Sequence, residues 1–265
     1  MTLDPALART WPVITLALAV AVAYPLIGLR RYRRIEHLPE PLPSTTRLRI
    51  YWSLIASQWT LVALIAFVLT RGGRSFADLG QTLGAWPRVT IGIGAGLLAL
   101  FAVLSVFTTR QLRVASASDL PSRMRRAGKI LPRNERERGW FVGVALTAGV
   151  CEEILYRGFL PWWIAGLTGS VGLGFGLSAI VFGLGHAYQG RGGVIVTGLL
   201  GACFGGIAWG LRSLVPGQVL HVAIDLVNGI AVGRTLERVQ AAPPAPTAPA
   251  APVPADVDAP AAPPA

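Results

Sequence analysis

Six ionisable residues lie inside long apolar stretches of the sequence, away from the ends of those stretches: Glu152, Glu153, Arg157, His186, His221 and Asp225. A charged side chain at the centre of a membrane helix costs about 2.5 to 3.5 kcal/mol on insertion scales. Several such residues in one chain therefore need a shared polar interior. We expect them to surround one cavity, and we interpret them as a candidate catalytic site.

Helical spacing gives the two neighbouring glutamates different surroundings. Glu153 and Arg157 are four residues apart and pair on one face of a helix, whereas Glu152 points about 100° away from them. A carboxylate without a local partner in an apolar setting takes up a proton more readily, which suits a general base for a water molecule. We predict that Glu152 is catalytic and that Glu153 with Arg157 is mainly structural.

Two histidines accompany these residues in the same half of the chain. His186 closes a glycine-rich run that begins at Phe182, where a neighbouring helix can approach closely. His221 and Asp225 are again four residues apart on one helix face, and Asn228 lies nearly on that face one turn further on. Their association with the glutamate pair favours a functional site over isolated hydrogen bonds.

The elements that must hold these residues are membrane helices. The chain is 52% hydrophobic and only 14% charged, against about 25% charged in an average soluble domain. Its apolar residues form blocks of about 17 to 25 residues, the length that crosses a bilayer. The blocks are 10–29, 50–70, 89–109, 139–160, 170–187, 193–211 and 215–233. The predicted fold is all-α, a polytopic transmembrane bundle of about seven helices.

The sequence divides into three expected parts. Residues 1–138 hold N-terminal scaffold helices and a basic cytoplasmic loop, residues 139–238 a catalytic helical core, and residues 239–265 a disordered tail rich in Ala and Pro. The segment 110–138 fits either a surface helix on anionic lipid or a solvated basic loop.

The net charge of +11 is interpreted as membrane topology. Segments 30–49 and 110–138 carry six and nine basic residues, against one before the first block and three in 71–88. Because basic loops favour the cytoplasmic side, the N-terminus is expected outside and the C-terminus inside. Basic residues do not interleave with aromatics on one face, so nucleic acid is not an expected partner. The preference for Arg over Lys, with abundant Ala, Gly and Pro, indicates a bacterial inner-membrane protein; the sequence sets no oligomeric state.

The polar residues of the last blocks resemble the signature of the CPBP intramembrane proteases, which include the CAAX prenyl endopeptidase and bacteriocin-processing, Abi-type proteins. The patterns E-E-x-x-x-R, F-x-x-x-H and H-x-x-x-N/D are matched by Glu152, Glu153 and Arg157, by Phe182 and His186, and by His221 and Asp225. The resemblance covers about residues 139–233. The three motifs in this order on apolar segments make it specific.

The resemblance implies an intramembrane endopeptidase whose partners are membrane lipids and a peptide or lipid-modified, prenylated-type protein substrate. A water molecule would be activated between Glu152 and His186, and His221 with Asp225 would stabilise the oxyanion. A carboxylate donates to an oxyanion only when it is protonated, so Asp225 either orients His221 or is kept neutral by burial.

Alternatives remain open from the sequence. A metal hydrolase would use His186, His221 and Glu152 or Asp225 as zinc ligands and leave a position for water, which makes zinc the one cofactor to consider. A Cys151 nucleophile is disfavoured by the adjacent carboxylate. A proton-coupled transporter or a non-catalytic immunity or interaction protein would also place Glu, His and Asp inside a membrane.

Overall fold

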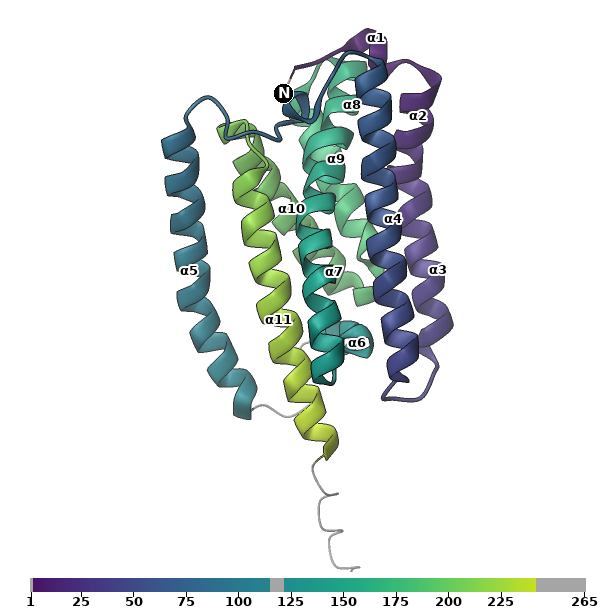
Figure 1. Ribbon diagram of the computed structural model, residues 1–265, viewed down its shortest axis with the longest axis vertical. Coiled ribbons are helices and arrows are strands. Elements are labelled where there is room, and N and C mark those ends of the chain that lie inside the picture. Colours follow the sequence, from purple (N-terminus) through teal and green to yellow (C-terminus); the bar gives the residue numbers. More distant parts are fainter. Residues whose placement is uncertain (1, 115–121, 242–265) are drawn as a thin grey trace, which may run out of the picture.

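The computed structural model describes residues 2–114 and 122–241, and every regular element in that part of the chain is helical. In chain order the elements are α1 (Pro5–Ala8), α2 (Trp11–Leu18), η1 (Ala19–Ala23), α3 (Tyr24–Glu36), α4 (Ser44–Arg71), η2 (Phe76–Leu79), α5 (Pro87–Val114), α6 (Ser122–Ala127), η3 (Gly128–Ile130), α7 (Glu135–Glu153), η4 (Ile154–Phe159), α8 (Leu160–Thr168), α9 (Val171–Gly185), η5 (Ala187–Gln189), α10 (Arg191–Leu211) and α11 (Val215–Ala241). Figure 1 shows the long helices side by side in one bundle. The predicted all-α helical bundle is confirmed.

The long helices identify a multi-pass membrane protein. Six helical segments are long and apolar enough to cross a bilayer: Trp11–Glu36, Ser44–Arg71, Pro87–Val114, Glu135–Thr168, Arg191–Leu211 and Val215–Arg238. They extend past the predicted apolar blocks by up to eight residues at one end. The reason is that a helix continues into the polar interface, whereas hydropathy marks only its apolar centre.

Helix α9 is shorter than the span expected at 170–187. Its 15 residues reach about 22 Å at about 1.5 Å per residue, less than the roughly 30 Å of a bilayer core. The helix ends at Gly185, and His186 follows as its C-cap. A helix that stops short brings a residue at its end to the depth of residues in the middle of longer neighbours. This is how His186 and Glu152 come to line one space.

Two helices contain a wide π-helical turn just before a proline. η1 precedes Pro25, and η4 precedes Pro161. Proline lacks the N–H that would bond to the carbonyl four residues back, and its ring crowds that carbonyl. Those carbonyls belong to Ala21 and Arg157, both inside the π turns. The η4 turn follows Glu153 directly, so the irregular backbone lies beside the candidate site.

Helix α7 occupies the middle of the bundle, between α4 on one side and α11 on the other, as Figure 1 shows. α11 also carries α5 on its outer face, and α9 packs between α8 and α10. Gly149 lets α7 and α11 approach closely, because a Cβ there would overlap Val222 Cγ2 and would lie 2.8 Å from the Val222 backbone nitrogen. Side chains on these two helices therefore meet across a short distance.

The arginine-rich connections lie at the same end of the bundle as the end of α11 (Figure 1). The described part of segment 110–138 is folded against the helices above it. The Tyr32 hydroxyl donates to the Arg126 carbonyl at 2.9 Å, and the Tyr51 hydroxyl donates to the Ile130 carbonyl at 2.7 Å. Lys129 Nζ donates to the Leu38 carbonyl at 2.9 Å. Residues 115–121 of this segment lie outside the described residues, as do residues 242–265 of the tail predicted at 239–265. The first residues of that predicted tail belong to α11, which ends at Ala241.

The close crossing of α7 and α11 generates the first prediction. Gly149→Val should lower the thermal stability of the purified protein in detergent, because overpacking a tight contact costs about 1 to 3 kcal/mol. Gly139→Ala is the matched control on the same helix, since a Cβ there meets nothing within 4 Å. Equal melting temperatures for the two variants would show that the crossing is less tight than described.

Candidate functional site

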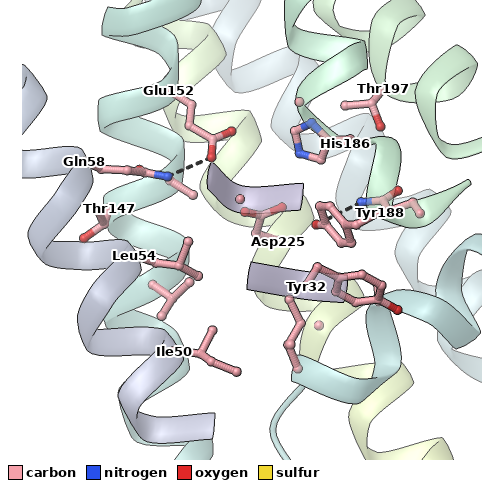
Figure 2. Close-up of a pocket in the computed structure, with 18 of the residues that line it drawn as sticks. Tyr32, Ile50, Leu54, Gln58, Thr147, Glu152, His186, Tyr188, Thr197 and Asp225 are labelled. Carbon is pink, nitrogen blue, oxygen red and sulfur yellow. Dashed lines mark hydrogen bonds between the residues drawn. The ribbon is translucent and has the colours of Figure 1, made fainter. Parts of the chain in front are cut away.

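A cavity of about 810 Å³ opens between the helices and contains most of the residues singled out in the sequence. Its walls include Glu152, Arg157, Phe182, His186, His221, Asp225 and Asn228. In Figure 2, Glu152 and His186 face each other from opposite walls, with Asp225 between them. Cys151 is fully buried and is not among the lining residues, which removes the support for a thiol nucleophile.

Glu153 is the most buried of the acidic residues in the site, with 1% of its side chain exposed. Its Oε1 lies 3.1 Å from Arg157 Nη1, as the helical spacing predicts. The same oxygen lies 2.9 Å from His221 Nδ1 on α11, a contact that spacing on one helix does not predict. Gly217 makes room for it, because a Cβ there would lie 3.1 Å from Glu153 Oε2. Both partners of Glu153 thus belong to the protein interior.

Glu152 is placed differently. Its Oε1 accepts a hydrogen bond of 2.9 Å from Gln58 Nε2 on α4, drawn as a dashed line in Figure 2. Its Oε2 lies 3.9 Å from His221 Nε2, beyond hydrogen-bond distance, and 14% of the side chain is exposed. One carboxylate oxygen is therefore fixed, and the other faces the cavity without a direct protein donor among the described residues.

His221 is surrounded by three carboxylates. Nδ1 bonds to Glu153, while Nε2 lies 3.9 Å from Glu152 Oε2 and 3.7 Å from Asp225 Oδ2. Because a carboxylate only accepts hydrogen bonds, Nδ1 must carry the hydrogen in the bond to Glu153. Nε2 is too far from the other two carboxylates for a direct hydrogen bond, so it has room for another oxygen atom.

His186 is oriented by its own helix end. Its Nδ1 lies 2.9 Å from the carbonyl oxygen of Phe182. A carbonyl only accepts, so Nδ1 carries the hydrogen and the neutral ring presents Nε2 as an acceptor. The Phe182 ring packs against the imidazole, with centroids 4.8 Å apart. The F-x-x-x-H spacing therefore brings both the carbonyl and the ring of Phe182 into contact with the His186 imidazole.

Arg157 connects the π turn to two other helices. Its guanidinium carbon lies 3.9 Å from the centre of the Phe182 ring and 5.6 Å from that of Phe204 on α10, in cation–π geometry. With 2% of its side chain exposed, it forms a buried pair with Glu153. Its contacts join α9 and α10 to the segment that carries both glutamates.

The zinc alternative finds no support in the arrangement of side chains. Within the described residues, no group of three His, Cys, Asp or Glu side chains is close enough to hold a metal ion. His221 and Glu152 approach each other to 3.9 Å, but His186 does not join them in such a group. The residues do not fit a three-ligand zinc site, so the chemistry below is derived from the protein's own groups.

Gln58 is a polar residue of the candidate site that the search for ionisable side chains missed. It lies in the predicted block 50–70, which the sequence analysis assigns to the scaffold, yet it contacts Glu152 directly. The signal was present in the sequence as an uncharged amide within an apolar block.

A family model described as Type II CAAX prenyl endopeptidase Rce1-like matches residues 135–227. This range begins at the start of α7 and ends within α11, and it contains the three motifs but neither Gln58 nor Asn228. Neither the curated proteins nor the solved structures include a significant match to the chain.

The buried contacts of Arg157 generate the second prediction. Arg157→Met should reduce the yield of folded protein and its melting temperature, because removing one partner of a buried ion pair costs about 3 to 5 kcal/mol. Arg110→Met, at an exposed position on α5, is the control and should change neither quantity. Unchanged stability of Arg157→Met would contradict a structural role for the pair.

Proposed function

We propose that the chain cleaves peptide bonds with a water molecule activated by Glu152 and His186. The match of residues 135–227 to a family of CAAX prenyl endopeptidases, which are hydrolases, supports this proposal. The observation that supports this most strongly is the difference between the two adjacent glutamates. Glu153 is committed to Arg157 and His221, whereas Glu152 keeps one oxygen directed to the cavity. A free carboxylate oxygen beside a histidine acceptor is the arrangement that general-base catalysis requires.

In the proposed reaction, a water molecule lies between Glu152 Oε2 and His186 Nε2. Glu152 accepts one proton from the water as its oxygen attacks the carbonyl carbon of the substrate. The carbonyl π bond opens to give a tetrahedral oxyanion. Glu152 then returns the proton to the amide nitrogen, the C–N bond breaks, and an acid and an amine leave. Across the cycle one water molecule is consumed and the enzyme is unchanged.

His221 is proposed to stabilise the oxyanion with Nε2. The ring donates from both nitrogens only as an imidazolium, and three carboxylates lie within 4 Å of it. Asp225, 3.7 Å from Nε2 and with 35% of its side chain exposed, then acts as a positioning residue for His221. It needs no proton of its own for this role.

The proposed substrate is a membrane-anchored or prenylated-type peptide. Below the polar centre the cavity is lined by apolar and aromatic side chains, among them Ile50 and Leu54 on α4 and Tyr32 and Tyr188 opposite them (Figure 2). Such a lining suits a lipid chain or an apolar peptide segment. Arg31, Arg34 and Arg49 also line the cavity, which places its open part near the arginine-rich end of the bundle.

The proposed location is a bacterial inner membrane, with the arginine-rich end of the bundle in the cytoplasm. The charge of the connections supports this orientation. The N-terminus would then lie outside and the C-terminus inside, and the substrate would enter from the inner leaflet.

The reaction generates the third prediction. Glu152→Gln should lower hydrolysis by about 10² to 10⁴-fold, the usual contribution of a general base, with an unchanged melting temperature. The assay uses purified protein and a set of quenched fluorogenic peptides, farnesylated or unmodified at a cysteine near the C-terminus. Glu135→Gln is the control, since its side chain is 83% exposed and lies outside the cavity. Absence of cleavage by the wild type would favour a transporter or a non-catalytic interaction protein, whereas full activity of Glu152→Gln would show that another group is the general base.

The orientation generates the fourth prediction. On a background of Cys151→Ala and Cys203→Ala, single cysteines replace His37, between α3 and α4, and Leu83, between η2 and α5. The cysteine in place of His37 should react with a membrane-impermeant maleimide only from the cytoplasmic side. The cysteine in place of Leu83 should react with it only from outside. The reverse labelling pattern would invert the proposed route of the substrate.

A further inference from the structure

Gln58 is a buried amide in the middle of a membrane helix. It lies on the 28-residue helix α4, and only 3% of its surface is exposed. α4 lies outside residues 135–227, so the family match says nothing about this residue. A neutral polar side chain in such a helix needs hydrogen-bond partners, because the surrounding lipid and apolar side chains supply none.

The amide satisfies only one of its two ends. Nε2 donates to Glu152 Oε1 at 2.9 Å, while the buried Oε1 atom lies near Tyr24 and accepts no hydrogen bond of good geometry from the described residues. The orientation follows from chemistry, since an ionised carboxylate accepts hydrogen bonds and only the nitrogen end can donate. The side chain thus gives Glu152 a hydrogen-bond donor from α4, a helix outside the three motifs.

The hydrogen bond determines what Glu152 can do. It fixes Oε1 toward α4, so rotation of the carboxyl group is restrained and Oε2 stays directed toward His221 and the cavity. The ionisable groups that face Glu152 from other helices are His221 and Asp225 on α11, His186 at the end of α9 and Tyr24 on α3. Among these neighbours, Gln58 supplies a neutral hydrogen-bond donor.

We propose that Gln58 is a positioning residue for Glu152, which holds one carboxylate oxygen and directs the other to the reacting water. This inference rests on the proposed role of Glu152 as the general base. It assigns a part of the catalytic machinery to a helix that lies far from the three motifs in the sequence.

The test uses Gln58→Met, which keeps the length of the side chain and removes the donor. With the peptide that the wild type cleaves fastest, kcat should fall about 10- to 100-fold, as when a partner that orients a functional group is removed. KM should stay within about twofold, because the amide does not contact the substrate. The melting temperature should stay close to the wild-type value, because methionine fills a similar volume in the apolar surroundings of α4.

Gln81→Met is the matched control. Gln81 and Gln218 exchange two amide hydrogen bonds, of 3.1 and 2.9 Å, which join the loop after η2 to α11. This variant should lose stability while the folded fraction keeps its kcat, the opposite of Gln58→Met. Gln58→Glu is a second variant with a side chain of the same shape that lacks the amide N–H. It should also lose activity, because its carboxylate would lie against the carboxylate of Glu152.

Wild-type kcat in both Gln58→Met and Gln58→Glu would overturn the inference. A fall in melting temperature with unchanged kcat in the folded fraction would also overturn it, because the amide would then be structural. These results are distinct from a failure of the proposed function, which would show as activity in Glu152→Gln or as no cleavage by the wild type.

Discussion

The carboxylate of Glu153 joins three helical segments from a position that solvent does not reach. One of its two oxygens, Oε1, lies 3.1 Å from Arg157 Nη1 and 2.9 Å from His221 Nδ1. The Arg157 guanidinium in turn lies over the Phe182 ring. A buried charge in a membrane is tolerated only with partners of this kind. The interaction therefore sets the distance between α7 and α11 and the orientation of His221, on which the rest of the site depends.

The same constraint explains why two adjacent glutamates do different work. Neighbouring residues on a helix point about 100° apart, so one carboxylate enters the packed interior and the other faces the cavity. The interior carboxylate has a cation and an imidazole as partners, whereas Glu152 has a neutral amide on one oxygen. The site thus combines a rigid ionic contact with a carboxylate that remains able to take up a proton.

Much of this arrangement follows from the sequence because burying charge in a bilayer is so costly. The apolar blocks predicted the helices, and the few ionisable residues inside them predicted that the last blocks share a cavity, which α3 and α4 also line. The Glu153–Arg157 pair followed from spacing alone. The contact of Glu153 with His221 did not, because it depends on how α7 crosses α11 at Gly149.

Gln58 and the short α9 were missed for other physical reasons. An amide carries no charge, so a search for ionisable groups passes over it, although burial in an apolar helix makes it equally dependent on a partner. The end of α9 was drawn too late because hydropathy does not mark where a helix stops inside the membrane. The π turn before Pro161 was likewise not predicted, since prolines also occur in ordinary kinks.

The most direct test of the central claim is a structure of the protein with a peptide difluoroketone, which hydrates to a tetrahedral diol that resembles the reaction intermediate. The account predicts one diol oxygen within about 2.6 to 3.2 Å of both Glu152 and His186, and the other within the same range of His221 Nε2. A diol bound through Glu153, or held outside the cavity between α4, α9 and α11, would contradict it.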